Sequence, residues 1–573
     1  MLSRSVPFRR TNSGLLQAER VKLSYERTKA IVQAYRLTAN DILHLSEKYW
    51  EFHTDPILVT DGGAGTLSTI HYNLCSGTLA MFTAGRTDIA RVLSDLLEFN
   101  LCGQYCLTEL GHGLDAINLE TTVTKLEDGQ LELHTPAERA AKFMPPTVPC
   151  GIPCVAIVFA RLIVRGEDRG VKPFLVPLHD GEQMYEGITS KQLPMRGGTD
   201  PVCHALTYFD RVLLPPTALL GGESKATDPR AAFFGNISRV ISGTLSMGAF
   251  AVSALRIGCC VAGRYSLRRT VTDASERIQR PIISFSTQYI PVLVGIAQAT
   301  VMRVFADVSH SRFTDSRNSL TVKHFIAAVF KTTVFQHVHT TLPPLGDRCG
   351  AQGLFEVNQL SVLHANMRGA AIAEGDILGI SIRFAVEVVL GRIVPPPPLN
   401  SDHILARRET GLIQELRETM LEASGHRSRK NEAILLPQCQ GLMEAIGHRL
   451  AIDSATEKGI DARIVKCYLA SVMSLDEAWY VEREGFSRSV LKAALLDAAT
   501  SLYPDMDHLL STLQADLYVT APIVSDDRWR AYTEALPSFR GQQGKRSDHY
   551  TRSLDMHADQ GCRAGQGGLK AML

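Results

Sequence analysis

The chain has 573 residues, 45% of them apolar, which indicates a folded protein with several packed regions because a single hydrophobic core stops growing well below this size. Its 60 lysines and arginines nearly cancel its 59 aspartates and glutamates, which argues against a nucleic-acid-binding protein that relies on neutralising phosphates. A partner that carries phosphates would need a local basic pocket.

Twelve cysteines are scattered along the chain without the paired Cys-x-x-Cys spacing of a zinc site. We therefore predict free thiols in a reducing compartment and no metal site. The most apolar long run, residues 242–263, contains Arg256 and many small residues, which favours a buried helix over a membrane span. We expect a soluble intracellular protein.

Residues 15–100 carry a helical pattern and predict an N-terminal helical domain over residues 1–104. The apolar spacing is clearest at Ile89, Val92, Leu93, Leu96 and Leu97. The glycine cluster 61–65 neither follows a clear strand nor ends in Gly-Lys-Ser/Thr, so we interpret it as a turn between helices and not as a phosphate loop.

The next stretch is Gly103-Gln104-Tyr105-Cys106-Leu107-Thr108-Glu109-Leu110-Gly111-His112-Gly113-Leu114-Asp115. It is too polar and glycine-rich for a core strand, so we predict a shaped junction loop. Gly111 and Gly113 permit a close backbone approach, and Thr108 offers a hydroxyl donor. Taken alone, these residues are also compatible with a tight turn capped by Thr and Asp.

Together with Leu119-Glu120-Thr121-Thr122, this run resembles the T-E-L-G-H-G and L-E-T-T motifs of the acyl-CoA oxidase family, a branch of the acyl-CoA dehydrogenase superfamily. In that family the segment lies against the flavin at the entrance to a β-barrel, and its threonine bonds the flavin ring. The resemblance implies FAD as cofactor and identifies Thr108 and Gly111 as candidate contacts.

The period of the pattern then changes from 3.6 to 2 and predicts a small β-barrel domain over residues 105–222. The predicted strands are 131–134, 155–165, 174–178 and 204–214. Phe174-Leu175-Val176-Pro177 and Phe209-Asp210-Arg211-Val212 resemble the family's F-I-V-P and F-D-x-V segments. The family's Lys-Trp-Trp-Pro-Gly-Gly is replaced by Lys142-Phe143-Met144-Pro145-Pro146-Thr147, so the acyl pocket is expected to differ.

Helical patterning returns over residues 231–394, a predicted flavin-binding bundle. The family's R-Y-S-x-x-R-R motif resembles the run Arg264-Tyr265-Ser266-Leu267-Arg268-Arg269. In the family the second arginine meets the cofactor's pyrophosphate, so the resemblance implies that Arg269 makes this contact. The alternative is that Arg269 is an exposed helix arginine paired with a carboxylate. The turn 348–354 resembles C-G-G-H-G-Y, which implies cofactor contacts from Gly350, Gln352 and Gly353; an ordinary turn between helices is the alternative.

Glu374 is the catalytic candidate, because a carboxylate in these apolar, glycine-containing surroundings is expected to have a raised pKa. The Glu-Gly-Asp run alone is also typical of a helix N-terminus, where acids are favoured. Its position about twenty residues beyond the glycine turn resembles that of the F-E-G-E-N base of the oxidases.

Four consecutive prolines at 395–398 end the bundle, and we predict an additional C-terminal helical domain over residues 400–535 and a mobile tail over residues 541–573. Ile464, Tyr468, Val472, Leu475 and Trp479 are expected on one helical face. The end Ala571-Met572-Leu573 resembles a peroxisomal tripeptide only at its first and last positions, so peroxisomal delivery and a cytoplasmic location both stay open.

The fold class we predict is α+β: an N-terminal helical domain, a central small β-barrel, a helical bundle and a C-terminal helical domain. The resemblance implies FAD-dependent α,β-dehydrogenation of an acyl thioester such as acyl-CoA, flavin reoxidation by O2 to give H2O2, and a homodimer in which the arginine and glycine-turn contacts reach the neighbouring subunit's cofactor. Two alternatives stay open: a dehydrogenase that passes electrons to a partner flavoprotein, and a catalytically silent homologue that serves as a binding or assembly partner.

Overall fold

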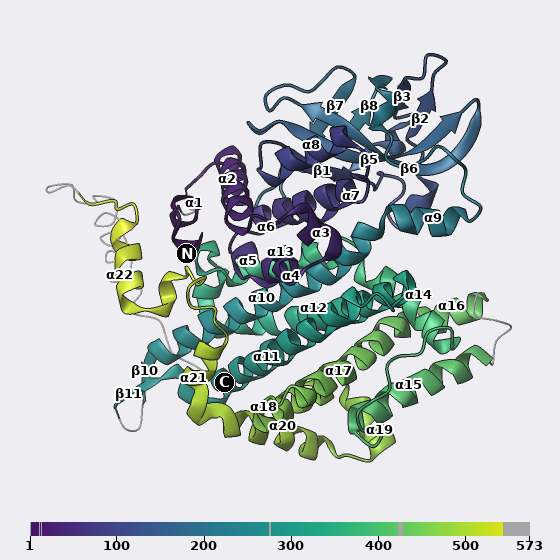
Figure 1. Cartoon of the computed structure of the whole chain (residues 1–573). Helices are drawn as coiled ribbons and strands as arrows, with labels where there is room; N and C mark the ends of the chain where they lie inside the picture. Colours follow the sequence, from purple (N-terminus) through teal and green to yellow (C-terminus); the bar gives the residue numbers. More distant parts are fainter. Residues whose placement is uncertain (1, 11, 13, 274–276, 422–427, 542–573) are drawn as a thin grey trace, which may run out of the picture. The chain divides into compact units, whose positions relative to one another are not determined.

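The N-terminal part of the protein is a set of short helices in the computed structural model, which describes residues 2–10, 12, 14–273, 277–421 and 428–541 (Figure 1). These are α1 (Val6–Arg9), α2 (Gln17–Tyr35), α3 (Ala39–His44), α4 (Glu47–Thr54), α5 (Ile57–Thr60), α6 (Gly62–Thr69), the π-helix η2 (Ile70–Ser76), α7 (Gly77–Ala80) and α8 (Thr87–Leu97).

The local sequence explains where three of these helices begin. The side chains of Thr38, Ser46 and Asp61 each accept a hydrogen bond from the backbone N–H three residues later, which caps α3, α4 and α6. The cluster Gly62-Gly63-Ala64-Gly65, which we predicted to be a turn, is therefore the first turn of α6.

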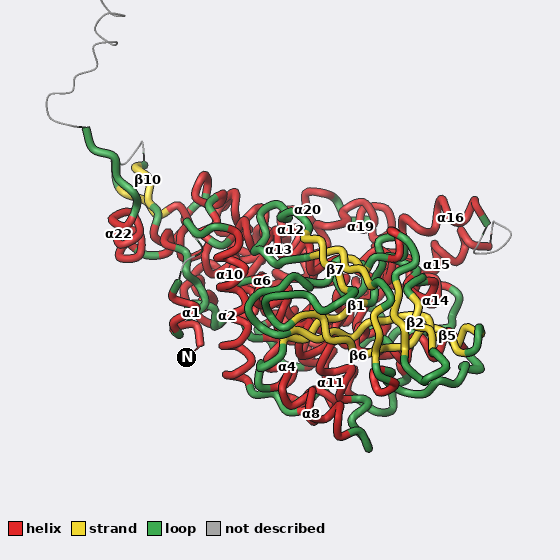
Figure 2. Tube along the Cα trace, turned by 90° about the horizontal axis from the view of Figure 1, so that it is seen from above, coloured by secondary structure: helices red, strands yellow, loops and turns green. Residues whose placement is uncertain are grey.

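The β-region contains nine strands in two sheets. They are β1 (Cys102–Cys106), β2 (Thr122–Lys125), β3 (Leu131–His134), β4 (Lys142–Phe143), β5 (Cys154–Val164), β6 (Glu167–His179), β7 (Ile188–Gln192), β8 (Ala205–Phe209) and β9 (Val212–Leu214). One sheet has the order β1-β5-β2-β3-β9 with β6 also paired to β5, and the other has the order β4-β8-β7. In the view of Figure 2 the strands β1, β2, β5 and β6 lie side by side.

Backbone hydrogen bonds join the two sheets on both sides. The N–H of Phe143 in β4 donates to the carbonyl of Thr108, just beyond β1, over 2.9 Å. On the other side, the N–H of Thr135, just beyond β3, donates to the carbonyl of Phe209 in β8 over 2.7 Å. The two sheets therefore curl into the β-barrel that the sequence predicted.

Our expectation of a loop at residues 103–115 is wrong for its first part, which is strand β1. This strand pairs in parallel with β5, from Cys102 beside Cys154 to Cys106 beside Val158. Its residues do not alternate in polarity because both faces are covered: Gln104 is fully buried, and a Cβ on Gly103 would lie 2.7 Å from the sulfur of Cys75 in η2.

A bundle of long helices follows the barrel. Its elements are α9 (Pro229–Asn236), α10 (Ser238–Arg268), the hairpin β10 (Thr270–Thr272) and β11 (Gln279–Pro281), α11 (Ser286–Thr314), α12 (Leu320–Arg348), α13 (Leu360–Ile372) and α14 (Ile377–Val389). α10 packs against α11, α12, α13 and α4 (Figure 1). By length and composition α10 and α11 could each span a membrane, but the apolar window of α10 is entirely buried in the protein and that of α11 is 61% buried, so packing accounts for their apolar character.

The C-terminal helices pack on the bundle through α17 and α18. They are α15 (Ile404–Leu421), α16 (Arg429–Leu435), α17 (Cys439–Glu457), α18 (Ala462–Met473), α19 (Glu477–Glu484), α20 (Arg488–Leu502) and α21 (Met506–Thr512). The single helical face predicted from Ile464 to Trp479 is wrong, because α18 ends at Met473. Trp479 instead belongs to α19 and packs against α15 at Gly411.

Residues Asp527–Leu573 form a second unit, separate from Met1–Asp526. Its described part contains most of α22 (Asp526–Ala535). All but the first residue of the tail predicted at 541–573 lies outside the described residues.

Candidate active site

Glu374 lies in the turn between α13 and α14, and two other helices hold the backbone of this turn. Glu374 has φ +53° and Gly375 has φ +101°, so a non-glycine residue adopts a left-handed conformation here. The ammonium of Lys331 in α12 donates to the carbonyls of Ala373 and Gly375 over 2.5 and 2.7 Å. The hydroxyl of Thr244 in α10 donates to the carbonyl of Glu374 over 2.6 Å.

The carboxylate of Glu374 reaches between α10 and the π-helix η2. Its Oε2 accepts a hydrogen bond from Nδ2 of Asn73 over 3.1 Å. A Cβ on Gly243 would lie 1.2 Å from the same oxygen, so only glycine at this point of α10 leaves room for the carboxylate. The side chain is therefore held in one place by packing and by a hydrogen bond.

Burial dominates the electrostatics of this carboxylate. Loss of hydration raises the pKa of Glu374 to about 8, against the opposing effects of the Lys331 charge, the Asn73 hydrogen bond and the Arg239 charge. Burial also lowers the pKa of Lys331 to about 7, opposed by Glu374 and Asp376. A carboxylate that titrates near neutral pH has the proton affinity that a general base needs.

The predicted flavin-contact loop lies on the same side of the molecule as Glu374. A Cβ on Gly379, at the start of α14, would lie 3.6 Å from the side chain of Leu114. The side-chain hydroxyl of Thr108 has no hydrogen-bond partner among the described residues. The same is true of the buried hydroxyl of Tyr105, whose pKa the Glu374 charge helps to raise. Of these two hydroxyls, that of Tyr105 is close enough to the carboxylate for its charge to act on it.

Much of the T-E-L-G-H-G run has a structural role that the sequence did not indicate. The buried carboxylate of Glu109 accepts hydrogen bonds from the backbone N–H groups of Glu120 and Thr121 and pairs with the ammonium of Lys142 over 3.0 Å. Gly111 donates its N–H to Arg139, and a Cβ on it would lie 3.0 Å from the Cβ of Arg139. Close packing within the barrel therefore explains Gly111.

The remaining predicted contacts lie at the other end of α10. Arg269 follows the last residue of α10 and is exposed, and its guanidinium makes no hydrogen bond or ion pair with a described residue. Nearby, the 3₁₀-helix η7 (Gly350–Leu354) contains the glycine turn, in which Asn358 donates to both the carbonyl and Oε1 of Gln352. Gly353 is buried and its missing Cβ would lie 2.1 Å from the carbonyl oxygen of Gly346, whereas Gly350 has φ +59°.

The structure therefore brings the seven predicted site residues into two groups and not one. From Gly243 to Arg269, α10 and its cap span 26 residues, or about 39 Å at 1.5 Å per residue. Thr108, Gly111 and Glu374 belong to one end; Arg269, Gly350, Gln352 and Gly353 belong to the other.

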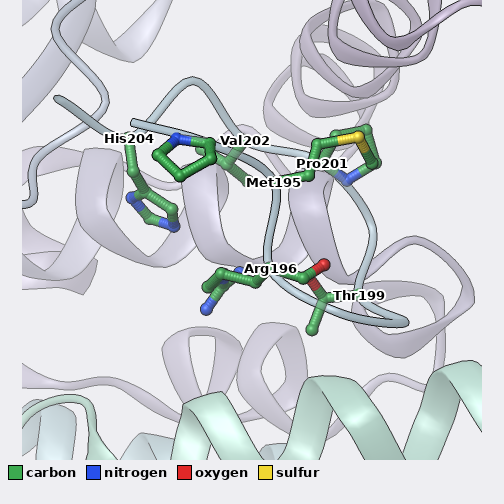
Figure 3. A pocket seen from close by; sticks show the side chains of 7 residues that line it. Met195, Arg196, Thr199, Pro201, Val202 and His204 are labelled. Atoms are coloured by element: carbon green, nitrogen blue, oxygen red, sulfur yellow. The ribbon is translucent and has the colours of Figure 1, made fainter. Parts of the chain in front are cut away.

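A small pocket in the β-region lies beside the altered segment 142–147. It is lined by Arg196, Thr199 and His204 among others, with the His204 ring and the Arg196 guanidinium both at the pocket (Figure 3). Nδ1 of His204 is 2.7 Å from the carbonyl oxygen of Met144, and its Nε2 has no partner among the described residues. Burial lowers the pKa of His204 to about 4, so the ring is neutral at pH 7.

Sequence reasoning missed Asn73, Gly243 and Lys331. Lys331 carried a usable signal, since it is the single charge within the apolar run 325–335 of α12. Asn73 and Gly243 carried none, because their importance depends on contact with a residue far along the chain.

Comparisons with known structures define the class of fold. Acyl-CoA oxidase 1 from Yarrowia lipolytica superposes with a TM-score of 0.77 at 17% identity, covering 100% of this chain and 93% of that one. Acyl-CoA oxidase-2 from Caenorhabditis elegans, whose structure was determined with FAD, ascaroside-CoA and ATP, gives 0.77 at 16% identity, covering 96% and 91%. The protein has the fold of the acyl-CoA oxidases.

Sequence comparisons point to the same class of proteins. A family model described as the acyl-CoA oxidase C-alpha1 domain matches residues 239–385, which include Gly243 and Glu374. Peroxisomal acyl-coenzyme A oxidase 1 of Arabidopsis thaliana is 26% identical over 309 residues, 50% of this chain and 46% of that protein. Human peroxisomal acyl-coenzyme A oxidase 3 is 22% identical over 325 residues, 52% and 46%. The chain spans about half the length of the curated relatives it matches, and it is similar to the acyl-CoA oxidases in sequence as well as in fold.

Proposed function

We propose that this protein is a FAD-dependent enzyme that forms a double bond between Cα and Cβ of an acyl thioester, with acyl-CoA as the substrate class. The observation that carries the proposal is the Glu374 carboxylate, which is fixed between Asn73 and Gly243 and whose pKa is raised to about 8 by burial. Such a group can take a proton from the carbon next to the thioester carbonyl.

In this reaction Glu374 removes the α-proton, and the electron pair of the broken C–H bond forms the new double bond as the β-hydrogen leaves with its own pair. Bound FAD would accept that hydride. The turn 373–375 keeps Glu374 aimed at the substrate because Lys331 and Thr244 hold its carbonyls. Backbone N–H groups that face the thioester carbonyl would stabilise charge on its oxygen.

The residues present suit a flavin dinucleotide. Thr108, with its free hydroxyl, would contact the flavin ring. The guanidinium of Arg269 has no ion-pair partner among the described residues and would bind the pyrophosphate with its two parallel N–H groups. Gln352, Gly350 and Gly353 would approach from the turn beside Arg269. Because the two groups stand about 39 Å apart along α10, one subunit's Arg269 end would serve the partner's flavin, so we propose a homodimer.

We propose O2 as the oxidant of the reduced flavin, giving H2O2, as the family name implies. A dehydrogenase that passes electrons to a partner flavoprotein is the same-class alternative.

The altered segment 142–147 lies next to the His204 pocket and favours a nonstandard acyl chain. It equally motivates a third candidate, a catalytically silent homologue. Relatives named as peroxisomal support the same location for this protein.

Glu374→Gln tests the proposal, since the amide keeps the size of the side chain but cannot take a proton at neutral pH. We expect wild type reconstituted with FAD to show bleaching of the flavin band when acyl-CoAs are added without oxygen. The variant should bind FAD equally well but bleach about 10²–10⁴-fold more slowly.

Admitting air then separates the remaining candidates. Rapid return of the flavin band with formation of H2O2 supports an oxidase, and slow return supports a dehydrogenase. If wild type binds no FAD, or if Glu374→Gln bleaches as fast as wild type, the proposed reaction is wrong.

A further inference from the structure

Asn73 stands out among the residues around Glu374 because the proposed reaction gives it no chemical step of its own. Its side chain is fully buried and comes from the middle of the π-helix η2, 301 residues before Glu374 in the chain. π-Helical turns are rare and occur frequently at functional sites. The position of Asn73 in a π-helix therefore suggests a functional role for this residue.

The hydrogen bonds of Asn73 fix the direction of its amide. Its Oδ1 accepts from the hydroxyl of Tyr49 at 2.8 Å, from Nη2 of Arg239 at 2.9 Å and from the hydroxyl of Ser242 at 3.1 Å. Three donors converge on this atom, so it must be the oxygen, and the NH2 group must lie on the other side. There Nδ2 donates to the carbonyl of Arg239 at 3.0 Å and to Oε2 of Glu374 at 3.1 Å.

The cations near Glu374 donate their hydrogen bonds to groups other than its carboxylate. Lys331 donates to two backbone carbonyls, and Arg239 donates to the carbonyls of Asn73 and Ile42 and to Oδ1 of Asn73. Among the described residues, Asn73 is thus the one hydrogen-bond donor to the Glu374 carboxylate. Oε1 accepts none from the same set and is left for the proton.

We propose, on the basis of the proposed function, that Asn73 is the positioning residue of the catalytic base: it fixes Oε2 of Glu374, stabilises the ionised carboxylate and leaves Oε1 to receive the substrate proton. The ionisable groups that act on this carboxylate come from five other elements or their caps. They are Lys331 of α12, Arg239 of α10, Tyr49 of α4, Tyr105 of β1 and, through Lys331, Asp376 at the start of α14.

Asn73→Asp is the sharpest test, because it keeps the shape and replaces the donor by an oxygen that carries negative charge. Loss of the donor and the new charge both disfavour the ionised form of Glu374, so its pKa should rise by about one unit or more. Asn236→Asp is the matched control: Asn236 is half-buried at the end of α9 and donates to the carbonyl of Val171.

Two measurements follow the titration of the Glu374 carboxyl group. The carboxyl C=O stretch of Glu374 in infrared difference spectra, assigned by its loss in Glu374→Gln, needs no flavin and reads the titration directly. The pH profile of flavin bleaching by acyl-CoA reads it through the reaction. In Asn73→Asp both should move upward by about one pH unit, which is a tenfold loss of rate on the acidic limb, and in Asn236→Asp neither should move.

The outcomes distinguish the two proposals. If the infrared titration moves in Asn73→Asp but wild type never bleaches with any acyl-CoA, the proposed function fails and the role of Asn73 towards Glu374 stands. If wild type bleaches but a folded Asn73→Asp titrates as wild type does, the positioning role is wrong. Should the aspartate variant fail to fold, Asn73→Ser takes the same measurements, and an unshifted titration overturns the inference.

Discussion

At the scale of single residues, the site depends on the absence of a side chain at Gly243 as well as on the polar groups around Glu374. Glu374 can reach Asn73 only because residue 243 of α10 has no side chain. The backbone of the turn is fixed independently by Lys331 and Thr244. A small change at Gly243 should therefore move the carboxylate while the turn stays in place.

Gly243→Ala should lower flavin reduction by about 10²-fold, because a displacement of a catalytic group by 1 Å can cost this much. The added Cβ would lie 1.2 Å from Oε2, so the Glu374 side chain must leave Asn73. Single-turnover bleaching of the flavin band measures the effect. Gly235→Ala in α9, whose Cβ would meet nothing within 4 Å, should react as wild type does, and an equally active Gly243→Ala would contradict this account.

Glu374 could be proposed as the base from sequence because its position after a glycine turn and before an apolar helix resembles that of the base in a known family. The contact of Asn73 could not be predicted, because Asn73 is one of several buried polar residues in its helix and its partner lies 301 residues away. The resemblance implies that the arginine and glycine-turn contacts serve the neighbouring subunit's cofactor, but the length of α10 that separates Gly243 from Arg269 becomes visible only when the helix is known to be unbroken.

At the scale of elements, a buried ion pair connects the parts of the barrel. The ammonium of Lys142 in β4 bonds Glu109, in the segment after β1, and the carbonyl of Phe159 in β5 over 2.7 Å. Neither side chain of the pair is exposed to solvent. Burial lowers the pKa of Lys142, and Glu109 opposes that shift. A charge left here without its partner would be costly.

Lys142→Met should lower the free energy of unfolding by about 3–5 kcal/mol, because it leaves the Glu109 carboxylate buried without its cation. Lys125→Met removes a cation from the more exposed pair with Glu223 in the same barrel and should cost less than about 1 kcal/mol. Urea denaturation followed by tryptophan fluorescence and circular dichroism gives both values. Equal losses in the two variants would show that the buried pair has no special role.

Strands with one covered face were predictable, and a strand with both faces covered was not. β3 has the alternating burial that its sequence Leu-Glu-Leu-His indicates. β1 contains Gly103 and Gln104 because it packs tightly on η2, so its pattern reads as a loop. The helix break at Met473 was missed for a related reason: Trp479 keeps the helical spacing of the preceding helix but packs on α15.

At the scale of the whole molecule, buried histidines occupy junctions between regions that are distant in sequence. His310 of α11 stacks on Trp50 of α4 with ring centroids 4.0 Å apart, which joins the N-terminal helices to the bundle. His337 of α12 lies 5.2 Å from the ring of His448 in α17, which joins the bundle to the C-terminal helices. These rings must stay neutral in the folded protein, since burial lowers the pKa of His310 and of His337 to about 3.

His310→Phe should therefore make the protein less sensitive to acid. In the unfolded chain a histidine has a pKa near 6.5. Between about pH 6.5 and 3 the unfolded state therefore binds a proton that His310 does not bind in the folded protein, so the free energy of unfolding falls as the pH falls. Phenylalanine keeps a ring against Trp50 but does not titrate, so the unfolding free energy of the variant relative to wild type should rise by about 1.4 kcal/mol for each pH unit below 6.5. Urea denaturation at pH 7.5, 6.5 and 5.5 measures this difference, with His508→Phe at an exposed position as control. A constant difference between wild type and His310→Phe across this range would mean that His310 takes up its proton in the folded protein, and the junction between α4 and α11 would then have to admit water.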